Sequence, residues 1–324
     1  VLNGSPKGDL SVTMQYVKFI AKKYPDHEFV IIPVGNRIRQ IEKDASIFDG
    51  IISQVRTADC VIFATPVYVA LVPSQYKRFI ELVFERNAAD AFAGKTGMSL
   101  TTSIHWYDHT AHNYLAAVAE DMGMRWAGFY SADMYDIMKE DNRQKLLDFM
   151  NYVFLFTTEK FPFARQFTQA ARSSFVYDAG ENSTAMDAEN LRVLIVTDSR
   201  GENPGIDAMI KRFSASIRGR VETVNVHELT INGGCLGCCE CGLDYRCVYT
   251  GKDDFIDFYN SRIKTADIII FAGTLRDRYL SAKFKEFFDR GFFNTHTPTL
   301  VGKQLGFLIS GPLNATPNIR EILQ

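Results

Sequence analysis

Short apolar runs alternate with longer amphipathic segments along the whole chain. Because parallel strands are buried on both faces and read as continuous apolar runs, this alternation is typical of strand–helix–strand units around a parallel sheet. In the first half the pattern predicts strands over Phe29–Val34, Cys60–Ala64, Thr96–Thr101 and Trp126–Tyr130. The amphipathic segments predict helices over Ser11–Lys23, Ile47–Val55, Pro73–Glu85, Thr110–Met122 and Asn142–Thr157.

A polar, aperiodic stretch at residues 172–190 separates this half from a second one, which opens on the apolar strand Leu191–Thr197. Clusters of Ser, Asn, Asp and Gly between periodic segments are typical of loops. We therefore expect a first domain at residues 1–171, a linker at 172–190 and a second domain at 191–324.

The two halves also repeat each other in sequence. Thr57-Ala58-Asp59 recurs as Thr265-Ala266-Asp267, 208 positions later. The same separation relates further pairs: Ile62-Phe63-Ala64 and Ile270-Phe271-Ala272, Lys77 and Lys285, Phe79 and Phe287. The sequence therefore predicts a tandem of one α/β unit, in which both copies are built on a doubly wound parallel sheet.

The separation is shorter at the first turn of each half, where Ser5 corresponds to Ser199, 194 positions later. The difference of 14 residues falls where most of the cysteines gather, so we expect a cysteine-bearing insertion in the second copy. Only 16 residues follow Leu308, whereas the first copy continues for about 57 residues after the matching Leu100. We therefore expect the second copy to lack its final strand and helix.

Composition narrows the class of protein. The chain has 324 residues, 46% hydrophobic and 23% charged, which are ordinary values for a globular protein of about two domains. Its 36 Lys and Arg nearly balance its 38 Asp and Glu, so no basic excess indicates a nucleic acid or an anionic membrane as partner. No apolar run approaches the ~18 residues of a membrane span. Because a buried strand needs about five residues and only Val1 and Leu2 precede the first turn, we expect several residues upstream.

The first turn has the features of a phosphate site. Leu2-Asn3-Gly4-Ser5-Pro6-Lys7-Gly8 follows a strand and leads to Ser11-Val12-Thr13 at a helix start. Backbone N–H groups and hydroxyls converge there in the positive field of a helix N-terminus, and Lys7 adds charge at the rim. The Gly-Lys-Ser/Thr ending of P-loop NTPases and the G-x-G-x-x-G dinucleotide motif are both missing. The alternative is an ordinary strand–helix turn.

Asn-Gly-Ser-Pro-Lys followed by Ser-x-Thr resembles the flavin phosphate loop of the flavodoxin-like superfamily of NADPH-dependent FMN reductases and iron–sulfur flavoproteins. Thr65-Pro66-Val67-Tyr68 resembles the loop that cups the isoalloxazine ring there, and Lys77-Arg78-Phe79 resembles the superfamily's Lys-x-Phe helix. This copy has Glu81-Leu82 where the superfamily usually has Asp-Arg. The resemblance implies FMN as cofactor, held by Asn3, Ser5, Lys7, Ser11, Thr13, Thr65, Pro66, Val67, Tyr68 and Ser103.

By the same resemblance, a third flavin-facing segment follows the strand that ends near Thr101. It reads Thr102-Ser103-Ile104-His105-Trp106-Tyr107. Its two large aromatic side chains, Trp106 and Tyr107, could stack on the flavin or simply pack against the protein.

Three histidines lie in and after this segment. His105, His109 and His112 follow the i, i+4, i+7 spacing that places side chains near one face of a helix. A metal site is therefore an alternative to flavin-pocket or surface histidines. Asp108 lies close, but no carboxylate or thiolate convincingly completes a ligand set.

Five of the six cysteines fall within thirteen positions, and four of them follow the spacing Cys235-x2-Cys238-x2-Cys241-x5-Cys247 after a predicted strand at Glu222–Val226. Clustered thiols in a chain of this size indicate metal binding rather than a disulfide framework, and hence a reducing, cytoplasmic setting. Four thiolates can ligate an iron–sulfur cluster or a tetrahedral zinc ion, and free or redox-active thiols are the third alternative. The pattern resembles the compact motif that binds a [4Fe–4S] cluster in iron–sulfur flavoproteins.

The second copy reads as a poor flavin site. Its first turn carries Asp198 and Glu202, which would repel a phosphate. Its second loop carries Arg276 and Arg278 instead of Thr-Pro-Val-Tyr, and these could bind an anion such as a nucleotide phosphate. The superfamily's helix signature, Lys285-x-Phe287 with Asp289-Arg290, is retained.

The first copy thus keeps the flavin loops and the second keeps the cysteines. In iron–sulfur flavoproteins the cluster of one subunit lies near the flavin of its neighbour, so the resemblance suggests that this tandem fuses such a pair. We expect an FMN-dependent oxidoreductase that moves electrons between NAD(P)H or a ferredoxin-like donor, a [4Fe–4S] cluster and FMN, with a redox protein or a small molecule as acceptor. The alternatives are a pure electron carrier, or a zinc-stabilised or degenerate scaffold that binds partners. Relatives are dimers or tetramers, so a homo-oligomer is expected.

Overall fold

The computed structural model describes residues 1–170, 177–181 and 185–324. The N-terminal domain is built on a five-stranded parallel sheet with the order β2-β1-β3-β4-β5. This is the strand order of doubly wound, flavodoxin-like sheets, so the predicted fold class is confirmed. The strands are β1 (Leu2–Asn3), β2 (Ile32–Pro33), β3 (Cys60–Pro66), β4 (Thr96–Thr102) and β5 (Arg125–Ala132).

Helices cover both faces of this sheet, because side chains in a buried strand alternate between two apolar layers. Val61 and Phe63 of β3 face the layer formed with α3, α4 and α5, whereas Ile62 and Ala64 face the layer formed with α1 and α6. The helices are α1 (Val12–Lys23), α2 (Ile38–Lys43), α3 (Ala45–Thr57), α4 (Ser74–Glu85), α5 (Asp108–Asp121) and α6 (Glu140–Thr158). Short 3-10 turns lie at Gly8–Leu10, Gly35–Arg37, Ala89–Ala91 and Asp136–Met138.

The C-terminal domain has four parallel strands in the order β9-β7-β10-β12, which matches β2-β1-β3-β4 of the first domain. The short strand β11 pairs with β10 in an antiparallel hairpin. The strands are β7 (Val193–Thr197), β9 (Val221–Asn225), β10 (Ile268–Arg276), β11 (Tyr279–Leu280) and β12 (Gln304–Ser310). The helices are α7 (Pro204–Ala215), α8 (Cys241–Asp244), α9 (Phe255–Phe258), α10 (Ala282–Arg290) and α11 (Ile319–Leu323), with a π-helical turn at Tyr259–Ile263 and 3-10 turns at Gly291–Asn294 and Leu313–Ala315.

The stretch predicted as a linker, residues 172–190, includes positions outside the described residues. Near its end β6 (Met186–Asp187) pairs with β8 (Ile217–Arg218), and Ala188 is buried beside Val193. The last residues of this stretch therefore pack on the C-terminal domain. The strand predicted over Phe29–Val34 is shorter than expected: it is the edge strand β2, in which Pro33 has no N–H to donate.

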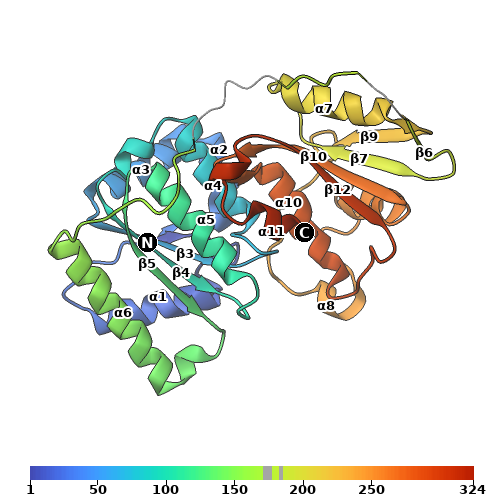
Figure 1. Cartoon of the computed structure of the whole chain (residues 1–324). Helices are drawn as coiled ribbons and strands as arrows, with labels where there is room; N and C mark the ends of the chain where they lie inside the picture. The colour runs from blue at the N-terminus through green and yellow to red at the C-terminus, as the bar shows by residue number, and fades with distance from the viewer. Residues whose placement is uncertain (171–176, 182–184) are drawn as a thin grey trace.

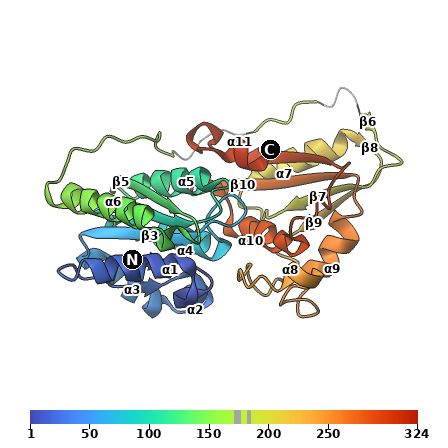
Figure 2. The ribbon, with the colours of Figure 1, turned by 90° about the horizontal axis from the view of Figure 1, so that it is seen from below.

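The two domains meet along α4 and α10, which lie side by side between the two sheets (Figure 1; Figure 2). One apolar cluster continues across this contact, from Phe79 on α4 to Phe284 and Phe287 on α10. A buried ion pair adds a second link, because Arg278 Nε and Nη2 donate to the two carboxylate oxygens of Asp121 on α5, over 2.6 and 2.7 Å. None of the helices in the described part of the chain has the length and apolar character needed to cross a membrane.

His112 is a buried polar contact between α5 and β4. Its ring nitrogens lie 2.7 Å from Ser99 Oγ and 2.9 Å from Thr101 Oγ1, and its ring stacks on Phe129 at a centroid distance of 4.2 Å. Burial lowers the pKa of His112 to about 4. The imidazole is therefore neutral in the folded protein at neutral pH.

This burial predicts a loss of stability in mild acid. Between pH 6.5 and 4 the unfolded chain, with an ordinary histidine pKa, binds a proton that the folded chain does not, so the free energy of unfolding falls by about 3 kcal/mol. Above pH 6.5 the contribution is fully present. Urea denaturation of the wild type and of His112→Gln, which does not titrate here, measures the difference. An equal acid-induced decline in both proteins would contradict the prediction.

Candidate functional site

The loop between β1 and α1 gathers buried polar groups at the carboxyl end of the sheet. Asn3 Oδ1 accepts a hydrogen bond from the Ser5 N–H (3.0 Å), and Ser11 Oγ caps α1 by accepting from the Met14 N–H (3.2 Å). Thr13 Oγ1 lies 2.7 Å from Thr102 Oγ1, which joins this loop to the end of β4. The side chains of Asn3, Ser5, Ser11 and Thr13 are all buried.

One donor of this loop is left over. The side-chain nitrogen of Asn3, Nδ2, is buried and has no hydrogen-bond partner within the described structure. A buried unpaired donor costs free energy unless an acceptor arrives. Because Asn3 ends β1, beside the β1/β3 switch point where doubly wound sheets bind their ligands, an external acceptor is the natural partner.

The glycines of the loop are fixed by close packing. A Cβ atom on Gly4 would lie 2.4 Å from the Tyr76 ring, and one on Gly35 would lie 2.3 Å from the Gly4 carbonyl oxygen. Gly8 has a φ of 58°, in the left-handed region that glycine adopts without strain. The sequence pattern of the loop therefore reflects a backbone held tightly against α4 and the start of the turn after β2.

The second loop follows β3 and forms a tight hairpin turn. The Tyr68 N–H donates to the Leu71 carbonyl (2.7 Å), and the Leu71 N–H donates back to Tyr68 (3.1 Å). Between them Val69 and Ala70 have φ values of 42° and 60°. Two consecutive non-glycine residues in this region, one of them β-branched, indicate a strained turn that its surroundings hold in place.

The third loop follows β4, and the Val67 N–H donates to the Thr102 carbonyl (3.1 Å), which ties it to the second. His105 and Tyr107 both have positive φ, and Ser103 Oγ accepts from the His105 N–H (2.9 Å). Large apolar side chains are exposed in all three loops, namely Leu10, Val69, Ile104 and Trp106. The ten predicted cofactor residues thus lie in or next to the segments at the carboxyl ends of β1, β3 and β4, and these segments also carry the exposed apolar side chains.

The three histidines do not form a metal site. His105 lies outside α5, where its Nδ1 is 3.1 Å from Asp108 Oδ2, and this carboxylate raises the His105 pKa. His109 Nε2 is 2.8 Å from Glu321 Oε1 of α11, and His112 is buried as described above. The interpretation from helical spacing fails because α5 begins only at Asp108.

The cysteine segment of the C-terminal domain lies against the second loop of the N-terminal domain. The Gln75 side-chain amide donates to the Cys235 carbonyl (3.1 Å), and a Cβ on Gly237 would lie 1.9 Å from the Tyr68 hydroxyl. Burial raises the pKa of Tyr68, and the nearby thiols raise it further, Cys235 most of all. Arg290 anchors the segment by donating to the Gly233 carbonyl (2.9 Å).

The predicted ligands have different surroundings. Cys241 is buried, Cys235 and Cys247 are half-buried, and Cys238 is exposed. Cys239, which lies outside the predicted ligand spacing, is also exposed. Burial raises the pKa of Cys235 to about 12, with smaller contributions from Asp289, Cys247 and Cys238. Across residues 1–170, 177–181 and 185–324, no group of three or more His, Cys, Asp or Glu side chains is arranged to hold a metal ion. The predicted thiol set therefore shares one segment without being gathered into a ligand set.

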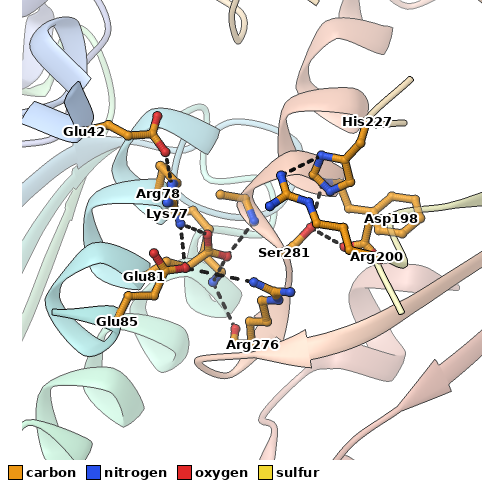
Figure 3. A network of polar contacts seen from close by, with 12 residues as sticks. Glu42, Lys77, Arg78, Glu81, Glu85, Asp198, Arg200, His227, Arg276 and Ser281 are labelled. Carbon is orange, nitrogen blue, oxygen red and sulfur yellow. Dashed lines mark hydrogen bonds and ion pairs between the residues drawn. The ribbon is translucent and has the colours of Figure 1, made fainter. Parts of the chain in front are cut away.

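A polar cavity of about 780 Å³ opens between the domains, next to the cysteine segment. Its charges are largely paired: Arg78 contacts Glu42, Glu81 and Glu85 (Figure 3). Arg276 contacts Glu202 at 2.6 Å. The expectation that Arg276 and Arg278 bind an anion is not met by Arg278, because it is buried and paired with Asp121.

The cavity also contains a histidine that sequence patterns do not single out. His227 Nδ1 accepts from Arg200 (3.1 Å). Desolvation, followed by the charges of Arg200, Lys283 and Arg276, lowers the His227 pKa to about 4. His227 is therefore neutral at neutral pH, and its hydrogen-bond partner Arg200 belongs to the same domain.

Comparison with known proteins finds similar solved structures and one matching family model. Solved structures with similarity to this chain include an apo NADH:FMN oxidoreductase (EMOB; 21% identity, 49% of this chain and 87% of that chain, TM-score 0.39) and an FMN-dependent NADH-azoreductase from Bacillus anthracis in complex with FMN (14%, 49% and 97%, 0.36). An NADPH-quinone reductase from P. pentosaceus is also similar (15%, 47% and 93%, 0.34). No curated protein matches. Residues 1–127 match the family model described as NADPH-dependent FMN reductase, so the similarity lies in the N-terminal domain.

Proposed function

We propose that the N-terminal domain binds FMN and works as an NAD(P)H-dependent FMN oxidoreductase. The observation that carries this proposal is the unpaired Nδ2 of Asn3, which lies among the buried hydroxyls of a loop that opens at the β1/β3 switch point. The family match of residues 1–127 supports the same chemistry. The donors fit a phosphate-bearing cofactor, because hydroxyls, an amide and a helix N-terminus all favour anionic oxygen.

The loops divide the work of binding. Ser5, Ser11, Thr13 and the backbone before α1 would hold the phosphate, with Lys7 supplying positive charge. The exposed apolar side chains of Val69, Ile104 and Trp106 offer the surface that a planar ring requires. Bound FMN would supply hydride-accepting and one-electron chemistry, while these residues bind it and orient it.

The donor and acceptor belong to the same proposal. The electrons come from NAD(P)H or a ferredoxin-like protein and pass to a small molecule or a redox protein, in a reducing, cytoplasmic setting and in a homo-oligomer. A pure electron carrier is the second candidate. It is favoured by the exposure of Ile104 and Trp106 at the sheet edge, since an accessible flavin edge suits docking of a redox partner.

A residue exchange between the domains tests FMN binding. In the C-terminal domain Thr197 stands where Asn3 does, and its Oγ1 accepts from the Ser199 N–H (3.2 Å). Asn3→Thr therefore keeps the acceptor for the turn and removes the unpaired donor. We expect the FMN dissociation constant to rise about tenfold, since one hydrogen bond to a charged group is worth about 1.5 kcal/mol or more.

Quenching of FMN fluorescence on titration with apoprotein measures this constant. The reverse exchange, Thr197→Asn, is the matched control and should leave FMN affinity within about twofold of the wild type. Wild-type affinity in Asn3→Thr would remove the observation on which the proposal rests. NAD(P)H oxidation by the FMN-loaded protein then separates an oxidoreductase from a pure carrier, which would be reduced slowly.

We further propose that the chain is a fused pair of flavodoxin-like copies in which Cys235, Cys238, Cys241 and Cys247 ligate a [4Fe–4S] cluster beside the flavin site. Two observations favour it: the strand orders of the domains match, and the cysteine segment touches Tyr68 of the flavin loop. The donor chemistry of four thiols suits iron.

Anaerobic iron and acid-labile sulfide assays test the cluster. We expect about four of each per chain, with broad absorption near 400 nm, and loss of both in Cys235→Ser. Cys239→Ser is the matched control, because Cys239 is exposed and outside the ligand pattern, and it should retain the iron. Zinc in place of iron, or thiols that titrate freely without metal, would refute the cluster and leave the flavin proposal intact.

A further inference from the structure

Two lysine–carboxylate pairs are buried where α4 meets α10. Lys77 Nζ lies 3.0 Å from Glu81 Oε1 on α4, and Lys285 pairs in the same way with Asp289 on α10. Both lysine side chains are fully buried, and the carboxylates are at most 4% exposed. Charges this deeply buried need further polar partners, because pairing alone does not replace lost hydration.

The carboxylates find these partners across the domain boundary. Asp289 Oδ2 accepts from the Ser74 N–H at the start of α4 (2.8 Å), and Glu81 Oε1 accepts from the Ala282 N–H at the start of α10 (2.6 Å). Each helix therefore has its first N–H groups capped by the other domain. The exchange is reciprocal, and it relates residues that stand 208 positions apart.

The lysines complete the exchange. Lys285 Nζ donates to the Tyr68 carbonyl oxygen (2.7 Å), and Lys77 Nζ donates to the Arg276 carbonyl oxygen (2.9 Å; Figure 3). Each of these carbonyls begins a hairpin turn with two non-glycine residues of positive φ. The turn residues are Val69 and Ala70 in the first domain, and Asp277 and Arg278 in the second. Each strained turn is thus held at its first carbonyl by a buried cation of the other domain.

The two turns have different surroundings. The first belongs to the Thr65–Tyr68 loop, touches the cysteine segment and exposes Val69 at the predicted flavin edge. The second carries Arg278, which is buried and paired with Asp121. A hydrogen bond from a buried lysine therefore supports both turns, one at the predicted flavin site and one with a structural role.

We propose that Lys285, through its hydrogen bond to the Tyr68 carbonyl, is a positioning residue that the C-terminal domain contributes to the FMN site of the N-terminal domain. The inference rests on the proposed flavin site and extends it: the site is incomplete without the second domain. Lys285 holds the Tyr68 carbonyl, and through it the turn that contacts the ring. Lys77 donates in the same way to the Arg276 carbonyl oxygen at the second turn. Because that turn lies outside the proposed FMN site, Lys77 provides an internal control.

The test compares two paired variants. Lys285→Met with Asp289→Asn removes the donor to Tyr68, keeps an acceptor for the Ser74 N–H and leaves no unpaired buried charge. Lys77→Met with Glu81→Gln does the same for the other half. We expect the first variant to raise the FMN dissociation constant about tenfold and the second to change it less than about threefold. Equal effects of the two variants, or no effect of either, would overturn the proposal.

Asp289→Asn alone isolates the lysine, because it retains the Nζ donor to Tyr68. It should keep FMN affinity within about threefold of the wild type even if it lowers stability. A tenfold loss in this single variant would mean that the pair acts only through the stability of the interface, against the proposal.

Hydrogen exchange separates this inference from the proposed function. In apoprotein the Leu71 amide, which donates to Tyr68, should exchange faster in Lys285→Met with Asp289→Asn than in the control variant, whether or not FMN binds. In the wild-type chain, FMN should slow exchange at Leu71 and Ser74 more than at their counterparts Tyr279 and Ala282. Unchanged Leu71 exchange in the first variant would overturn the positioning role, whereas failure of the wild type to bind FMN would overturn only the proposed function.

Discussion

Four charged groups buried between α4 and α10 impose the strongest constraint on this molecule. Lys77, Glu81, Lys285 and Asp289 have lost their water, and hydrogen bonds from the opposite domain satisfy part of what they lost. If the domains were separated by even a small distance, buried charges would lose these partners at a cost of several kcal/mol. The apolar contacts of Phe79 and Phe287 add affinity, but the exchanged hydrogen bonds require one particular arrangement.

This arrangement gives two consecutive residues at the end of α10, Asp289 and Arg290, different roles. Asp289 caps α4, while the next residue, Arg290, turns toward the cysteine segment and pairs with Asp253 at 2.7 Å. One helix end therefore fixes both the domain contact and the segment that reaches Tyr68. In the N-terminal domain the corresponding positions are Glu81 and Leu82. Leu82 is buried in the apolar cluster, and this domain has no cysteine segment for an arginine to anchor.

Much of the fold could be predicted from the sequence, because buried apolar positions recur with the period of a strand or a helix. Alternating apolar runs predicted the sheet and five of the six helices of the first half, missing only the short α2. The constant separation of 208 predicted that Lys77 and Lys285 occupy equivalent positions. The partners could not be predicted. Lys77 and Glu81 are spaced i, i+4, which reads as an ordinary surface pair on one helix, and nothing local shows that their remaining hydrogen bonds cross to another domain. The histidine metal site, an alternative that needed His105, His109 and His112 on one helix, is excluded because the left-handed Tyr107 places the helix start after His105.

The cysteines show what spacing in the sequence cannot predict. Spacing identifies which sulfur atoms could bind a metal, but not whether each thiol is protonated. Thiols bind metal as thiolates, whereas burial raises the pKa of Cys235 to about 12, so its surroundings favour the protonated thiol. Binding of a metal centre would have to displace that proton and draw the exposed Cys238 toward Cys235 and Cys241. The Arg290 contacts fix the start of the segment, and the close approach of Gly237 to the Tyr68 hydroxyl fixes its middle. The segment is therefore held beside the α4–α10 contact and against the Thr65–Tyr68 loop.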